Sequence, residues 1–164
     1  MMKVWLLLVV ASLVVGCFPV RFDRELWRRN HSEGGEIAGA DVSIDISGDV
    51  NHIGARDVGD KKVIVGVTSK ADQGVELRRI IVRSDDRNLY DFEPETRIRM
   101  VKHELAEQWD GDYQTDAILK FDGRVSTVYV DAFVRINGGG IRKVTSRFER
   151  DSIKGIRKVN LTEM

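Results

Sequence analysis

Apolar residues alternate with polar ones in several stretches from residue 41 onward, and this alternation restricts the chain to β-structure. Val42, Ile44 and Ile46 are separated by single polar residues, and residues 63–67 and 125–136 repeat the pattern. Because successive side chains of a strand point to opposite faces, the pattern is typical of strands with one buried face.

The alternation and the turn residues together predict about seven or eight short strands. Residues 117–121 and 125–136 are expected to form a hairpin at Asp122-Gly123, because Asp-Gly favours the positive φ angles of a tight turn. With residues 141–149, which follow a Gly-rich break, they would make a three-stranded antiparallel meander. The other predicted strands are 42–46, 63–67, 75–82, 98–100 and a last one that holds Ile156, Val159 and Leu161.

The number and length of these strands predict a mainly β protein, an antiparallel β-sandwich of the immunoglobulin-like kind with at most one short helix. The alternative is a single antiparallel sheet with a covering helix. Residues 101–109 have helix-like spacing and are expected to form one or two helical turns. Residues 47–61 contain three glycines and are expected to be a turn-rich connection.

The composition argues against several classes of function. The chain has 164 residues, a length that suits one domain, and its 26 basic residues equal its 26 acidic residues in number. Because a protein that neutralises phosphates needs a surplus of Lys and Arg, we expect no nucleic-acid partner. The single Cys excludes an internal disulfide and a metal site built from several cysteines, and we expect no cofactor.

The first residues have the anatomy of a secretory signal. Lys3 precedes a run of 12 residues, Val4 to Val15, in which Ser12 alone is polar. A helix needs roughly 20 apolar residues to cross a bilayer, so this run is too short to span one. A cation, a short apolar run and small residues in this order are typical of a signal peptide that is removed from the mature protein.

Residues 13–17, Leu-Val-Val-Gly-Cys, resemble the lipobox of bacterial lipoprotein precursors. The resemblance covers the leader alone. It implies cleavage between Gly16 and Cys17, attachment of diacylglycerol to the Cys17 thiol, and acylation of the new amino terminus with a fatty acid such as palmitate. Phe18 stands where the family has Asp in proteins that stay in the inner membrane. The resemblance therefore implies a location on the periplasmic face of the outer membrane, with the inner membrane as the weaker alternative.

These features divide the chain into a signal peptide (1–16), a lipidated Cys with a tether (17–40) and a β-sandwich domain (41–164). The tether carries Pro19 and a strongly charged stretch, residues 21–29. Phe22 and Leu26 are spaced i, i+4, so a short amphipathic helix is one interpretation, and a solvated linker is the other.

Two short motifs contain residue types that bind metals. His103-Glu104-Leu105-Ala106-Glu107 is similar to the zinc motif H-E-x-x-H, with Glu107 in place of the second His. Asp110, Asp112 and Asp116 are similar to the start of a calcium loop, but the Gly and Glu that such a loop requires are missing. The weak metal candidates are therefore His103, Glu107, Asp110, Asp112 and Asp116. A solvated surface is the simpler interpretation of both motifs. No set of catalytic residues is predicted.

Charge is unevenly distributed along the chain. Residues 85–116 hold ten acidic and four basic residues, and residues 142–158 hold seven basic and two acidic ones. The basic segment is compatible with a surface for lipid phosphates, an acidic glycan or an acidic partner. The favoured interpretation is that the two segments neutralise each other on adjacent strands.

The sequence thus predicts a lipid-anchored, non-enzymatic binding or structural module that faces the periplasm and contacts an envelope protein or a cell-wall component. The first alternative is an accessory subunit of an envelope assembly or secretion machine. The second is a hydrolase or metal enzyme.

Overall fold

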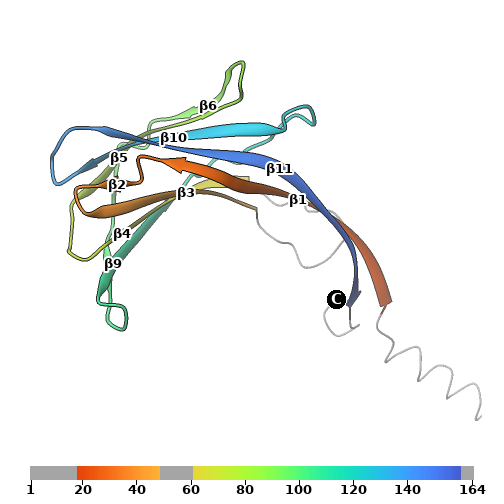
Figure 1. Cartoon of the computed structure of the whole chain (residues 1–164), viewed down its shortest axis with the longest axis horizontal. Helices are drawn as coiled ribbons and strands as arrows, with labels where there is room; N and C mark the ends of the chain where they lie inside the picture. The colour runs from red at the N-terminus through yellow and green to blue at the C-terminus, as the bar shows by residue number, and fades with distance from the viewer. Residues whose placement is uncertain (1–17, 49–60, 160–164) are drawn as a thin grey trace, which may run out of the picture. The chain divides into compact units, whose positions relative to one another are not determined.

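The computed structural model describes the backbone of residues 18–48 and 61–159 and the side chains of residues 27–46 and 61–151 (Figure 1). The predicted signal peptide, Cys17, and residues 49–60 of the turn-rich connection lie outside the described residues. The chain divides into two compact units. One comprises Trp27–Gly48 and Asp60–Asp151, and the other comprises Met1–Leu26, Asp49–Gly59 and Ser152–Met164.

The described residues form strands in two sheets. The first sheet has the order β1-β11-β10-β5-β6, with β7 also paired to β5, and the second has the order β2-β3-β4-β9-β8. The strands are β1 (Phe18–Glu33), β2 (Glu36–Ile37), β3 (Ala40–Gly48), β4 (Lys61–Ser69), β5 (Val75–Arg83), β6 (Asn88–Phe92), β7 (Thr96–Ile98), β8 (Val101–His103), β9 (Gln108–Gln114), β10 (Thr127–Ile136) and β11 (Arg142–Val159). The predicted antiparallel β-sandwich is therefore confirmed. The alternative with a covering helix is wrong, because residues 18–48 and 61–159 contain no helix.

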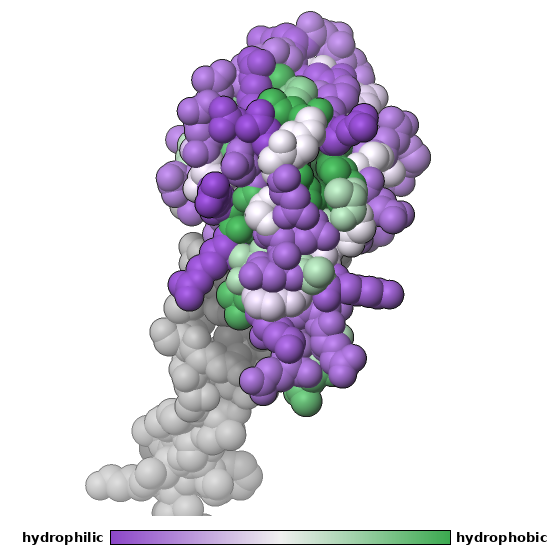
Figure 2. All heavy atoms as spheres, turned by 90° about the vertical axis from the view of Figure 1, so that its left-hand side faces the viewer, coloured by the Kyte–Doolittle hydropathy of each residue, from purple (hydrophilic) through white to green (hydrophobic). Residues whose placement is uncertain are grey.

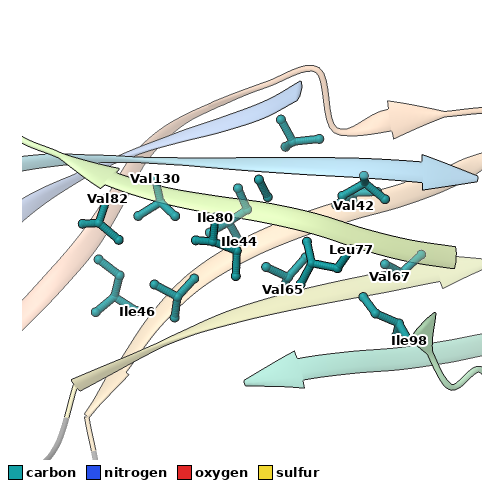
Figure 3. Close-up of a cluster of buried hydrophobic side chains, with 14 of the residues drawn as sticks. Val42, Ile44, Ile46, Val65, Val67, Leu77, Ile80, Val82, Ile98 and Val130 are labelled. Atoms are coloured by element: carbon teal, nitrogen blue, oxygen red, sulfur yellow. The ribbon is translucent and has the colours of Figure 1, made fainter. Parts of the chain in front are cut away.

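Apolar side chains fill the space between the two sheets of the larger unit. Val42, Ile44 and Ile46 from β3 and Val65 and Val67 from β4 face Leu77, Ile80 and Val82 from β5 and Val130 from β10 (Figure 3). Each large aliphatic side chain that is fully buried contributes about 1.5–3 kcal/mol relative to an exposed one. Seen from the left-hand side of Figure 1, the surface is mostly hydrophilic, and hydrophobic residues show only as small groups (Figure 2).

The predicted tether is wrong from Trp27 onward. The backbone of residues 18–33 is the strand β1, and the Trp27 side chain is only 6% exposed within the core. Its ring centroid lies 4.6 Å from that of Phe121. The short helix considered for Phe22 and Leu26 is also wrong, because both residues belong to this strand. Their spacing is ambiguous, since residues four apart share a face of a strand as well as of a helix.

The predicted helical turns at residues 101–109 are replaced by a hairpin. Strand β8 pairs with β9 in an antiparallel arrangement, and the residues between them form a turn. The motif around His103 and Glu107 therefore lies on a strand and a turn, where residues four apart do not share the helical face that a zinc helix requires. The strand predicted at residues 98–100 is β7, which ends at Ile98.

The predicted meander is half right. Strands β10 and β11 form the expected hairpin, with Asn137 and Gly138 at positive φ in the turn. Residues 117–121 form no strand and make one isolated bridge, between Leu119 and Lys61 of β4. The turn there is formed by Gly123 and Arg124, with Asp122 as its first residue, and neither Asp122 nor Gly123 takes the predicted positive φ. The other neighbour of β10 is β5. The last strand predicted around Ile156 and Val159 is not a separate one, since β11 continues to Val159.

Candidate functional site

The outer side of the first sheet carries two rows in which an aromatic side chain lies between two cations. Tyr129 of β10 is opposite Arg83 of β5 and Arg147 of β11. Phe133 of β10 is likewise opposite Arg79 of β5 and Lys143 of β11. All six side chains point away from the core, because their neighbours along each strand are the buried ones. We call these six residues the cation–aromatic face.

Asp131 lies between the two rows and holds the first of them in place. Although it belongs to the outer side of β10, it is only 6% exposed. It accepts a hydrogen bond from Thr145 Oγ1 at 2.6 Å and one from Arg83 Nε at 3.1 Å. The Arg83 guanidinium carbon also lies 4.4 Å from the centroid of the Tyr129 ring, within the range of a cation–π interaction. Arg83 is therefore fixed both by a carboxylate and by a ring.

Arg79 is fixed by a second carboxylate. Its Nε donates to Asp91 Oδ1 at 2.8 Å and its Nη2 donates to Asp91 Oδ2 at 2.6 Å. This bidentate hydrogen bonding lowers the pKa of Asp91 and raises the pKa of Arg79. Both groups are accordingly charged across the neutral pH range.

A third row on the same side adds positive charge. Glu76 of β5 is opposite Arg97 of β7 and Arg135 of β10. Its carboxylate lies 3.8 Å from Arg97 Nη2, 3.5 Å from Arg135 Nη1 and 3.8 Å from Arg78 Nη1. Three guanidinium groups therefore share this one carboxylate, although Arg78 also pairs with Glu95 at 3.0 Å.

The cation–aromatic face retains hydrogen-bond donors for an external ligand. Arg83 uses Nε for Asp131, and within residues 27–46 and 61–151 its two terminal nitrogens have no acceptor. Lys143 is exposed and makes no ion pair with any described side chain. Guanidinium and ammonium groups that keep free donors bind carboxylates, phosphates and sulfates. Arg83 and Lys143 therefore have the chemistry to hold an anion, whereas Arg79 and Arg147 already pair with Asp91 and Glu149.

The predicted metal candidates lie elsewhere, around the β8–β9 hairpin. His103 Nε2 is 3.9 Å from Asp110 Oδ2, which makes this the one close contact between candidates that the described residues show. Glu107 is exposed in the turn at a φ of 50°, Asp112 is exposed on β9, and Asp116 follows that strand. In the described part of the chain, no three His, Cys, Asp or Glu residues form a group that could hold a metal ion. The predicted lipidation and cleavage sites, Cys17 and Gly16, lie outside the described residues.

The acidic and basic segments are not adjacent, so the predicted mutual neutralisation is wrong. The basic segment forms most of β11, which β10 and β5 separate from β6, and β8 and β9 belong to the other sheet. The acidic residues find partners on β5 instead, since Asp91 pairs with Arg79 and Glu95 with Arg78. Opposite charge in two segments of the chain does not determine that their strands are neighbours in a sheet.

Sequence reasoning missed Asp131, although the sequence contains a signal for it. Asp131 stands between Val130 and Ala132 in the longest alternating run, on the polar side of that pattern. Its burial depends on Arg83 and Thr145, which are 48 and 14 residues away along the chain. Only the strand register brings these three residues together.

In the described residues, 18–48 and 61–159, no helix is long and apolar enough to cross a membrane. Comparisons of the chain with protein-family models, with curated proteins and with solved structures find no significant match.

Proposed function

We propose that this chain is a lipid-anchored, non-enzymatic binding module of the bacterial cell envelope, attached through Cys17 to the outer membrane and facing the periplasm. The observation that carries the proposal is the sequence of residues 13–17, with a charged start and a short apolar run before it. Two or more acyl chains anchor a protein stably without a membrane-spanning helix.

We also propose that the cation–aromatic face is the binding surface and that its ligand is an anionic component of the envelope. The arrangement of Arg83 supports this role, because Asp131 and Tyr129 hold its guanidinium in one position while terminal donors remain exposed. A side chain that is ordered before binding loses less entropy when the ligand arrives.

The anchor is tested by replacing Cys17 with Ser and following the incorporation of labelled fatty acid and the distribution between membrane and soluble fractions. The Cys17→Ser variant should lose the label and leave the membrane fraction. Phe18→Leu is the matched control, because it keeps the thiol and should remain attached. Unchanged membrane association of Cys17→Ser would refute the anchor.

The binding surface is tested by cross-linking in intact cells, followed by identification of the captured partner. Arg83→Gln should reduce the yield of the cross-linked product, since it removes the positioned cation. Arg87→Gln is the control, because Arg87 is an exposed residue of the β5–β6 turn and lies off the face. Equal yields from both variants would contradict the proposed surface.

One observation favours the alternative of an accessory subunit with an obligate partner. Leu105 is fully exposed at the tip of the β8–β9 hairpin, and Val101 of the edge strand β8 is 55% exposed. An exposed strand edge with apolar side chains is a ready contact for another chain. If this alternative holds, Leu105→Ser should abolish co-purification of the partner and leave the unfolding transition of the protein unchanged.

A further inference from the structure

The outer side of the second sheet is acidic, in contrast to the cation–aromatic face. Glu36 of β2, Asp41 of β3 and Asp110 of β9 lie in one row, in which Thr68 of β4 separates the two aspartates. Asp45 of β3 and Asp112 of β9 point to the same side. We call these five carboxylates the acidic face; the described strands place one lysine, Lys62, on that side.

The carboxylates of the acidic face lack the partners that those of the first sheet have. Among the described residues, Glu36, Asp41 and Asp112 make no ion pair. Asp45 accepts a hydrogen bond from the neighbouring backbone N–H of Ile46. Asp110 accepts hydrogen bonds from Gln108 Nε2 at 3.2 and 3.3 Å, and its Oδ2 lies 3.9 Å from His103 Nε2. Several negatively charged carboxylates on one surface repel each other, and this repulsion favours binding of an external cationic partner.

The centre of the acidic side carries small residues. It is formed by Ser43 of β3 with Gly66 and Thr68 of β4. A Cβ added at Gly66 would lie 2.9 Å from Ser43 Oγ, so the space above Gly66 is closed by a small side chain and not by a large one. A surface with small central residues leaves room for the larger rings of Tyr129 and Phe133.

The two faces also have the same spacing of charges. Asp41 and Asp110 are two strands apart, as are Arg83 and Arg147, which corresponds to about 10 Å in each case. Asp41 and Asp45 are four residues apart along β3, and the cations of β5 repeat at the same interval, about 13 Å. Opposite charges on the two sheets can therefore come into register over two rows, in which the acids of one copy would add to the carboxylates that already pair with Arg83, Arg79 and Arg147 within their own sheet.

We infer that the acidic face of one copy of this chain docks on the cation–aromatic face of a second copy. This inference rests on the proposed role of the cation–aromatic face and names its partner. The contact joins two different surfaces, so each copy keeps one face open and copies can add head to tail.

The contact should be weak in solution. The three central strands of the acidic side, β3, β4 and β9, are up to nine residues long and cover about 400 Å². Counted over both partners this is about 800 Å², which is below the roughly 1,000 Å² of a stable interface, and a contact of charged groups is sensitive to salt. Anchoring to a membrane raises the local concentration of copies and would favour such a contact.

Sedimentation velocity of the full chain in detergent micelles tests self-association directly. The wild type should form concentration-dependent dimers and larger species at low ionic strength. These species should dissociate in about 1 M salt, where the screening length is about 3 Å. A monomer at every protein concentration in low salt would overturn the inference, as would association that high salt leaves unchanged.

Charge reversal then identifies the surfaces. The double variants Lys143→Glu/Arg147→Glu and Asp41→Lys/Asp110→Lys should each lose self-association, and an equimolar mixture of the two should recover it, because each variant offers a face that complements the other. Asp72→Lys in the exposed β4–β5 loop is the control and should associate like the wild type. Circular dichroism spectra identical to that of the wild type show that each variant folds. Failure of the mixture to associate would refute the docking of these two faces.

The outcomes separate this inference from the function on which it rests. If the wild type is monomeric but Arg83→Gln still reduces cross-linking to another envelope component in cells, the partner is not a second copy and the binding surface stands. If neither association nor cross-linking depends on the face, both proposals fail.

Discussion

Replacing Asp131 with Asn tests how the cation–aromatic face is built. The substitution keeps the size of the side chain and an acceptor for Thr145 but removes the negative charge that fixes Arg83. Hydrogen bonds to charged groups contribute about 1.5–3 kcal/mol to stability. The Arg83 side chain is 35% exposed, so water replaces part of the lost interaction, and we expect a loss of about 1–2 kcal/mol in the free energy of unfolding.

Urea unfolding of the full chain, monitored by Trp fluorescence, measures this loss. A double-mutant cycle with Asp131→Asn and Arg83→Gln should show a coupling energy of at least about 0.5 kcal/mol, as expected for groups in direct contact. Asp91→Asn is the matched control on the same face, and it should cost less because Asp91 is the more exposed carboxylate. Strict additivity in the cycle, or a more stable Asp131→Asn variant, would refute the ion pair as the device that positions Arg83.

Three further predictions concern packing and pH. A Cβ at Gly111 would lie 2.6 Å from a backbone carbonyl oxygen, so Gly111→Ala should lower the free energy of unfolding by about 1–3 kcal/mol in the same urea titration. Gly123→Ala is the control: a Cβ there would have no atom within 4 Å, and the free energy of unfolding should change by less than about 0.5 kcal/mol. Phe148→Ala removes the largest fully buried side chain and should cost about 3–5 kcal/mol, which calorimetry would reveal as a lower Tm. The Asp91 carboxyl should titrate in NMR below its ordinary pKa of about 3.9 and return to it in Arg79→Gln. Because the pKa of Asp91 is lowered by folding, the stability from this pair is present above about pH 4 and is lost as the pH falls through the lowered value.

The parts of the fold that the sequence predicts are those with local periodicity. Strands β3, β4 and β10 alternate, β5 does so less regularly, and each occurs close to its expected position. The β10–β11 hairpin is also local, because the residues that reverse the chain, Asn137 and Gly138, take the positive φ angles that their residue types favour.

The missed strands have patterns that fit two structures. Phe22 and Leu26 are spaced four residues apart, as are Val101 and Leu105, and this interval fits a helical face as well as a strand face. Strand β9 contains few aliphatic residues, and Gly111 occupies one of its inward positions. Contacts with β4 and β8 make this segment a strand, and single-sequence periodicity does not contain that information.

The cation–aromatic face could not be predicted from the sequence either, because it depends on which strands are neighbours. Its rows exist only because β10 lies between β5 and β11, with Tyr129 and Phe133 each placed opposite two cations. The sequence pattern assigned the chain around residue 120 to the position that β5 occupies. Because one neighbour of β10 was predicted wrongly, neither row of the cation–aromatic face could be predicted.

The proposed function depends most on the lipid anchor, and the intact mass of the mature protein purified from membranes tests this anchor directly. The mature chain should begin at Cys17 and carry the added mass of a diacylglycerol group and an amide-linked fatty acid. A mass that corresponds to a chain retaining Met1, with an unmodified thiol at Cys17, would contradict the anchor.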